Sequence, residues 1–432
     1  MSAPAPRGAE YELPRRWRHV PNVVHAGRRS FGIIREQDGQ RIFRKYFHRT
    51  GDGWKAYWTE KKAARLFRDS SWAMPWIRSG WTLSGHPWFD VAAYPEENRL
   101  DRVLARATES ERHRLAIEAL SIVLDLYVAG YAHRDFHTRN LALVAGHLQL
   151  HDFEFLLPFP PNYRSRFSES YDITGQGLPS PARTNNMGFN ADRGGRLNLP
   201  VIAHAAGISW DAAQRGLADL LRKELLAVSK TFRSDKEGNR HVCKTERIYC
   251  SFTVPGLVVR AEEAQRNAAR RFARYGMTKS DLTGKRILDL GCHAGGMLFA
   301  AQEFQPGQCM GVEYDLNKVR VARRIAAFAD LPQVHFQQGD IDRTSPRALG
   351  GEHDVVFCFA LERHLTRRHR LCRLLGRVTR DLLLFETNSQ TDPAQVEREL
   401  RRNGFRHVEQ LGMCDDDSCP ENNVRHLLKA WK

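Results

Sequence analysis

The spacing of apolar and polar positions predicts two structurally different halves. In the first half, period-two segments separated by turn residues predict short strands at residues 23–25, 31–34 and 41–47. Apolar positions with helical spacing then predict helices over residues 56–68 and 108–130. This half is therefore expected to combine a small antiparallel sheet with helices.

The second half has a different pattern. Strongly apolar segments predict strands at residues 286–290, 310–313, 334–341, 354–359 and 382–386. Helices are expected over residues 210–232 and 260–275, and the polar run 234–239 between them predicts a domain edge. The pattern is typical of an α/β domain that follows an α+β domain.

The stretch from His133 to Asn140, followed by His151-Asp152-Phe153-Glu154, has the spacing of a phosphoryl-transfer loop. Asp135 is placed to accept the proton of a hydroxyl group, and Asn140 and Asp152 are placed to hold Mg²⁺. The apolar residues between them, with a turn at Ala145-Gly146, predict a hairpin that brings Asp152 back to Asn140.

This spacing resembles the kinase-like superfamily. Glu154 stands where protein kinases have a Gly, and no Ala-Pro-Glu segment follows. The likeness is therefore to lipopolysaccharide (Kdo/heptose) kinases and to aminoglycoside and choline phosphotransferases. It implies a two-lobed domain that uses ATP, with Lys45 on the ATP phosphates and Glu60 orienting Lys45. The alternatives are an exposed strand Lys and a solvated helix Glu. The Gly-rich loop is degenerate, with only Gly27 and Gly32 in its place.

The strand at 286–290 enters the turn Gly291-Cys292-His293-Ala294-Gly295-Gly296, where backbone can approach a ligand closely. With the acids that end the next strands, this series resembles class I S-adenosylmethionine-dependent methyltransferases over residues 280–432. The resemblance implies S-adenosylmethionine as cofactor. It also implies which residues would hold the methionine, ribose and adenine parts of the cofactor: Asp289, Gly291, Gly295, Glu313, Asp340 and Ile341. His293 replaces the usual middle Gly, and a nicotinamide-binding domain is the alternative. Glu362 and His364, after the fourth strand, are candidate bases.

The net charge of +16 over 432 residues predicts an acidic partner such as phosphate groups, nucleic acid or an anionic membrane surface. Six arginines between residues 367 and 380, with no acid among them, predict either a site for phosphate or an anionic surface, or a solvated basic helix. The eight cysteines form no C-x-x-C pair, which is typical of free thiols in a reducing cytosol. No apolar window is long enough to span a membrane. We expect a cytoplasmic protein, with peripheral contact at the inner face of the cytoplasmic membrane as a further option.

Together these patterns predict a kinase-like domain at residues 1–235, a linker at 236–259 and a Rossmann-like methyltransferase domain at 260–432. The pairing is similar in its activities to O-antigen chain-terminating enzymes. The expected function is ATP-dependent phosphorylation of a glycan or lipid-linked saccharide, followed by methylation of the installed phosphate. An RNA-modifying methyltransferase with an accessory kinase-like domain is one alternative. A pseudokinase scaffold attached to an active methyltransferase is another.

Overall fold

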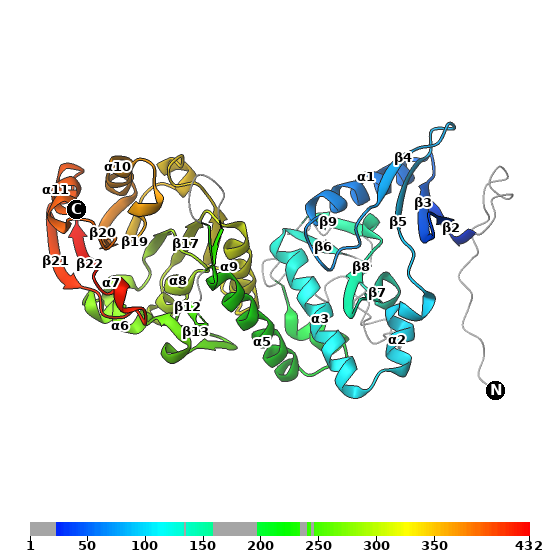
Figure 1. The fold of residues 1–432 in the computed structure, drawn as a ribbon, viewed down its shortest axis with the longest axis horizontal. Helices are drawn as coiled ribbons and strands as arrows, with labels where there is room; N and C mark the ends of the chain where they lie inside the picture. The colour runs from blue at the N-terminus through cyan, green and yellow to red at the C-terminus, as the bar shows by residue number, and fades with distance from the viewer. Residues whose placement is uncertain (1–22, 134, 159–196, 234–239, 243–245) are drawn as a thin grey trace. The chain divides into compact units, whose positions relative to one another are not determined.

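The computed structural model describes residues 23–133, 135–158, 197–233, 240–242 and 246–432. The chain divides into two compact units, Met1–Ala213 and Gln214–Lys432 (Figure 1). Each unit has its own sheet and its own buried core. Among the described residues, no helix is long and apolar enough to cross a membrane.

The N-terminal unit opens with a five-stranded antiparallel sheet in the order β1-β2-β3-β5-β4. Its strands are β1 (Val23–Ala26), β2 (Ser30–Gln37), β3 (Gln40–Phe47), β4 (Arg78–Trp81) and β5 (Pro87–Ala92). Helix α1 (Gly51–Leu66) lies between β3 and β4 in the chain, and Thr50 caps it by accepting a hydrogen bond from the Gly53 backbone. Ala56 and Tyr57 of α1 pack into the core of the sheet, so one face of the helix is buried.

The remainder of this unit is built on helices and short strand pairs. The helices are α2 (Leu100–Arg106), α3 (Glu109–Val128) and α4 (Leu199–Ala205). Strand β6 (Tyr131–His133) pairs with β9 (Leu156–Pro158), and β7 (Leu141–Val144) pairs with β8 (His147–Leu150). The predicted hairpin is thereby confirmed, and its turn residues Ala145 and Gly146 both have positive φ, as a two-residue hairpin turn requires.

The boundary between the units lies earlier than the pattern predicts. Helix α5 (Trp210–Ser229) contains the division between Ala213 and Gln214, whereas the sequence pattern predicts a domain edge after residue 235. Residues 248–259, expected to be linker, instead form strands, because alternate side chains are buried against helix α8 (Gly296–Ala300). These strands are β12 (Ile248–Cys250), β13 (Phe252–Val254) and β14 (Leu257–Val259). The pair β10 (Thr231–Arg233) and β11 (Arg240–Val242) precedes them.

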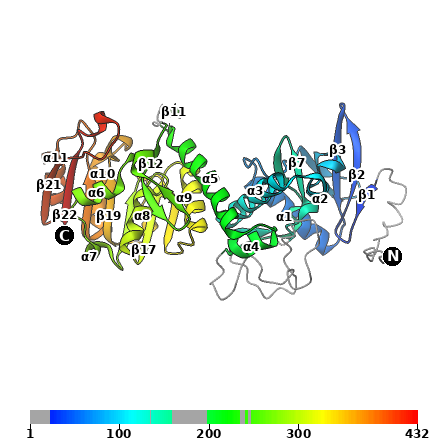
Figure 2. The same cartoon turned by 90° about the horizontal axis from the view of Figure 1, so that it is seen from below.

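The C-terminal unit is a seven-stranded sheet in the order β18-β17-β16-β19-β20-β22-β21 (Figures 1 and 2). The strands are β16 (Arg286–Leu290), β17 (Gln308–Glu313), β18 (Val334–Gln338), β19 (His353–Phe359), β20 (Thr379–Glu386), β21 (His407–Met413) and β22 (His426–Trp431). The first five are parallel, and β22 is antiparallel to both of its neighbours. All five predicted strands are confirmed.

The helices of this sheet are α6 (Ala268–Arg274), α7 (Lys279–Leu282), α8, α9 (Leu316–Phe328), α10 (Arg368–Val378) and α11 (Pro393–Arg402). The helix predicted over residues 260–275 is wrong in its first half. Strand β15 (Ala264–Arg266) occupies that place and pairs in parallel with β12, which buries the Arg266 side chain. Asn267 then caps α6.

The order of the strands defines where this sheet can bind a ligand. The chain builds β16, β17 and β18 in one direction and then crosses to β19 on the other side of β16. In open α/β sheets, ligands bind outside the carboxyl ends of the strands at such a reversal. The turn that follows β16 lies at this edge.

Candidate active sites

Lys45 and Glu60 form a buried ion pair in the N-terminal unit. Lys45 lies on β3 and Glu60 on α1, and the Lys45 Nζ atom lies 3.1 Å from Glu60 Oε1. Their exposed fractions are 4% and 1%, so the alternatives of an exposed Lys and a solvated Glu do not apply. The pair forms because α1 packs its buried face across the sheet, where Glu60 is the one buried carboxylate of the helix.

Two further carboxylates surround the same ammonium group. Asp152 accepts a hydrogen bond from Lys45 Nζ, and Glu154 Oε2 lies 3.6 Å from that atom. Burial acts to lower the pKa of Lys45, but the charges of Asp152, Glu60 and Glu154 raise it above its ordinary value. Burial and the two neighbouring carboxylates raise the pKa of Glu60 to about 8. The site therefore concentrates negative charge.

Asp135 and Asn140 form a second polar group, at the loop between β6 and β7. The Asn140 Nδ2 atom donates to Asp135 Oδ2 at 3.1 Å and to the Asp135 carbonyl oxygen at 2.9 Å. The His137 ring nitrogen lies 3.3 Å from Asp135 Oδ1. Burial acts to raise the pKa of Asp135, but the hydrogen bond and charge of His137 lower it below its ordinary value. Asp135 is thus held as a carboxylate.

His133 ties the two groups together. Its Nε2 atom lies 3.0 Å from the Asp152 carbonyl oxygen, and its Nδ1 atom accepts from the Asp135 backbone at 3.3 Å. Burial lowers the pKa of His133, so the ring is neutral and can make both contacts. Asp152 itself has a left-handed backbone, with φ of 64°. Arg134, within the same motif, lies outside the described residues.

The predicted Mg²⁺ ligands, Asn140 and Asp152, come from the two ends of the hairpin. The Asn140 carbonyl oxygen accepts from the His151 backbone at 3.0 Å, which keeps these ends together. In the described part of the chain, no three His, Cys, Asp or Glu side chains form a metal-binding group. Mg²⁺ is usually held by one or two protein ligands together with phosphates and water, so the residues present fit it.

In the C-terminal unit, the predicted cofactor residues lie at the carboxyl ends of β16, β17 and β18. Gly291 and Gly295 both have positive φ, and a Cβ atom on Gly295 would lie 2.5 Å from Phe336. A side chain is excluded at Gly295, because both its positive φ and its close packing against Phe336 favour Gly. Asp289, at 3% exposure, lies just before this turn. Burial and the charge of Glu313 raise the pKa of Asp289 to about 8.

Glu313 closes the turn from the next strand. Its Oε2 atom accepts from the His293 backbone at 3.0 Å, and its Oε1 atom accepts from the Tyr314 and Asp315 backbones. Oε1 already accepts from two donors, but Oε2 accepts from only one, so Glu313 can still accept a hydrogen bond from a ribose diol through Oε2. Asp340 and the buried Ile341 follow β18 after Gly339. The sheet therefore brings the predicted cofactor residues to one edge.

The partners of His293 could not be predicted from the sequence. This residue adopts positive φ in the position of the usual Gly, and its ring stacks on Tyr249 with centroids 4.1 Å apart. The guanidinium of Arg266 lies 5.3 Å from the Tyr249 ring centroid on β12. Burial lowers the pKa of His293 well below its ordinary value. No local pattern indicates this stack, because β12 and the turn are more than forty residues apart in the chain.

A buried charge network at the end of β20 was also missed. Glu386, fully buried, contacts Arg271 at 2.7 Å, Arg266 at 3.0 Å and Arg425 at 3.2 Å. Asp416 and Asp417 supply two further carboxylates to these arginines. Burial acts to raise the pKa of Glu386, but the three arginines lower it to about 2.

The arginines between residues 367 and 380 do not all lie at one place in the structure. Helix α10 runs from the carboxyl edge of the sheet toward the opposite edge, because it connects the end of β19 to the start of β20. Arg380 binds Asp354 at 2.8 Å, at the amino end of β19. Only the first arginines, such as Arg367 and Arg370, remain near the edge that carries the cofactor residues. Glu362 is buried there and His364 is exposed, both just after β19.

Comparison with known proteins supports a specific class for this second unit. Residues 281–409 match the family model described as "Methyltransferase domain". No curated protein matches the sequence. Among solved structures, EvdMO1 is similar at 19% identity and a TM-score of 0.33, over 50% of this chain and 47% of that chain. The chain thus spans about half the length of that relative.

Two smaller structures are similar as well. YcgJ from Bacillus subtilis shows 13% identity over 38% of this chain and 97% of its own, with a TM-score of 0.31. An S-adenosylmethionine-dependent methyltransferase from Mesorhizobium loti shows 16% identity over 40% of this chain and 100% of its own, with a TM-score of 0.32. On the family match, the C-terminal region contains a methyltransferase domain.

Proposed function

We propose that the chain is a bifunctional transferase. Its N-terminal unit would transfer the γ-phosphoryl group of ATP to a sugar hydroxyl of a glycan or lipid-linked saccharide. Its methyltransferase domain would then methylate the phosphate that has been installed. The observation that carries the first half is the buried Lys45–Glu60 pair placed against Asp152, with Asp135 and Asn140 connected to the same site through His133.

The residues of this site have complementary tasks in phosphoryl transfer. Glu60 holds the Lys45 ammonium in place, where it can neutralise the phosphates of ATP. Asp135, kept as a carboxylate, can accept the proton of the attacking hydroxyl group. Asn140 and Asp152 would hold Mg²⁺, which offsets the negative charge of the phosphoryl group during its transfer. The new bond joins the sugar oxygen to the γ-phosphorus, and ADP leaves.

For methyl transfer, the strand ends would position the cofactor. The turn at Gly291 and Gly295 would hold the methionine and ribose parts, Glu313 would accept from the ribose diol, and Asp340 and Ile341 would lie beside the adenine. A phosphate oxygen is already an anion, so it needs no general base, only alignment with the methyl group. The oxygen–carbon bond forms as the sulfur–carbon bond breaks. Methylation of a sugar hydroxyl would instead require a base, for which Glu362 and His364 are the candidates.

The order of the two reactions tests this proposal. A lipid-linked oligosaccharide is offered to the full chain with labelled S-adenosylmethionine, with and without prior incubation with ATP and Mg²⁺. We expect methyl incorporation only after phosphorylation. The Asp135→Ala variant should methylate acceptor that wild-type protein has already phosphorylated, and no other acceptor.

Two outcomes would redirect the interpretation. Methylation of untreated acceptor by Asp135→Ala at the wild-type rate would place the methyl group on a sugar hydroxyl. Methylation of RNA with no phosphorylation of any saccharide would favour an RNA-modifying enzyme, for which the net charge of +16 is the supporting observation.

A further inference from the structure

One surface of the N-terminal unit combines exposed apolar side chains with cations. The Leu83 side chain, at the turn between β4 and β5, has a relative exposure of 111%. Trp58 on α1 and Trp81 on β4 are about half exposed, at 52% and 49%. Together with three nearby cations, these side chains form what we call the aromatic-basic face: Trp58, Ile77, Trp81, Leu83, Lys61, Arg65 and Arg68. Exposed apolar groups that gather in this way mark an interaction site.

Ring contacts show that the hairpin and the helix form one continuous surface. The Trp81 ring lies 5.1 Å from that of Trp54 and 5.6 Å from that of Tyr57, both on α1. The Trp58 ring packs on Tyr57 at 5.3 Å, and Lys61 Nζ lies 5.1 Å from the Trp58 ring centroid. Strand β4 therefore lies along α1, and its turn projects beyond the sheet (Figure 1).

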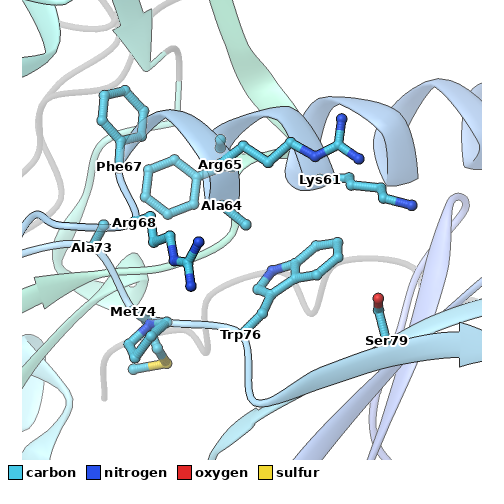
Figure 3. Close-up of a pocket in the computed structure, with 12 residues that line it drawn as sticks. Lys61, Ala64, Arg65, Phe67, Arg68, Ala73, Met74, Trp76 and Ser79 are labelled. Carbon is cyan, nitrogen blue, oxygen red and sulfur yellow. The ribbon is translucent and has the colours of Figure 1, made fainter.

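A cavity of about 350 Å³ opens within this face, between α1 and the segment that leads into β4 (Figure 3). Its cationic lining comes from Lys61, Arg65 and Arg68, and its opposite wall includes Trp76. Stacking on Phe89, with centroids 4.3 Å apart, holds the Trp76 ring in position. No acidic residue lines the cavity.

The charge of this face is one-sided. The two acids of α1 are engaged elsewhere, Asp52 with Arg28 and Glu60 with Lys45. Between residues 61 and 89, Asp69 is the only acid in the sequence. In the described part of the chain, no carboxylate pairs with the three cavity cations. The face thus offers cations to an anionic partner without competition from within the protein.

We propose that the aromatic-basic face docks onto an anionic lipid surface. Leu83 and the two tryptophans enter the boundary between headgroups and acyl chains, where amphipathic indole rings are favoured. The cations of the cavity bind the phosphate of a lipid headgroup. A fully exposed aliphatic tip favours lipid over nucleic acid, because Leu has no ring on which a base can stack. This inference does not depend on the proposed phosphoryl transfer.

The test is flotation of the full chain with vesicles of phosphatidylcholine alone or mixed with phosphatidylglycerol. We expect binding to the mixed vesicles only, weakening as salt is raised. Each of Lys61→Ala, Arg65→Ala and Arg68→Ala should weaken binding about fivefold, and Leu83→Asp about tenfold or more. Bilayers of brominated lipid should quench the tryptophan fluorescence of the Trp81→Phe variant less than that of the wild-type protein, because one ring that enters the bilayer has been removed.

Matched substitutions outside the face serve as controls. Arg402 is exposed in the last turn of α11, and Val424 is 44% exposed. The variants Arg402→Ala and Val424→Asp therefore remove a cation and introduce an acid at an exposed apolar position, as the test variants do, but outside the face. Equal losses in these controls would show that net charge alone drives binding, which would overturn the proposal. Binding of soluble glycerol phosphate at the cavity without binding of vesicles would overturn it as well.

Discussion

Both units bury a group of charges beside the residues expected to act on a substrate, but the two groups are balanced differently. Around Lys45, three carboxylates face one buried ammonium group, and Arg29 reaches Glu154 at 3.6 Å. Around Glu386, three arginines face three carboxylates, so the network is neutral within itself.

This difference is the one expected between a site that binds a cation and a structural element. Crowded carboxylates repel one another, and the surplus is offset when a divalent cation binds. A self-neutral buried network has no such need, and removal of one partner leaves an uncompensated charge in the core. We therefore expect mutations in the first group to affect activity and mutations in the second to affect folding.

The largest effect is expected for Asp152→Ala. Loss of the proposed metal ligand should reduce phosphoryl transfer at least about a thousandfold. Because the substitution also removes one of three crowded carboxylates, stability against urea should stay within about 1 kcal/mol of wild type. The measurement is transfer of labelled phosphate to saccharide acceptor, and Asp69→Ala, at an exposed acid of the same unit, is the control. Full activity of Asp152→Ala with ATP and Mg²⁺ would contradict the assignment.

A smaller effect, on stability, is expected at Glu386. Its pKa is about 2 in the folded protein, below the ordinary value of 4.5, so its carboxylate stabilises the fold above pH 4.5. That contribution, about 3 kcal/mol, is lost as the pH falls from 4.5 toward 2. The Glu386→Gln variant should therefore be less stable than the wild-type protein at neutral pH. It should also lose less stability than wild type as the pH falls from 4.5 toward 2.

Hydrogen exchange of the β20 amides in urea, measured at each pH, reports on this unit alone. The control is Glu397→Gln, which breaks a surface pair with Arg401 and should change stability by about 0.5 kcal/mol or less. If Glu386→Gln and wild type lose stability in parallel below pH 4.5, the network does not carry the acid sensitivity.

The smallest effect is expected for Glu313→Ala. Loss of the hydrogen bonds to a ribose diol should weaken binding of S-adenosylmethionine to the full chain about tenfold, as measured by calorimetry. Glu303→Gln, at an exposed acid of the same unit, is the control. Unchanged affinity in Glu313→Ala would mean that another residue holds the diol.

Local patterns were sufficient to predict many of the elements. Alternation and turn residues located the β7–β8 hairpin, and all five parallel strands were found from their apolar runs. The turn after β16 could be located from the sequence, because the strand end, the glycines and the helix start are adjacent in the chain. The assignment of the cofactor residues stays a prediction. The prediction of a helix over residues 260–275 was wrong in its first half. Arg266 lies there in a strand, and its charge is buried because Glu386 pairs with it.

The sequence by itself determined the periodicity of strands and helices, the spacing from Asp135 to Asp152, and the turn after β16, because each depends on residues close in the chain. Only the tertiary structure decided which charges meet. Lys45 reaches Glu60 because α1 folds across β3, and Glu386 meets Arg266 from 120 positions away. It also decided that Arg380 lies at the opposite end of its sheet from the cofactor residues. Such contacts depend on how whole elements pack, and no local spacing encodes the direction in which a helix crosses a sheet.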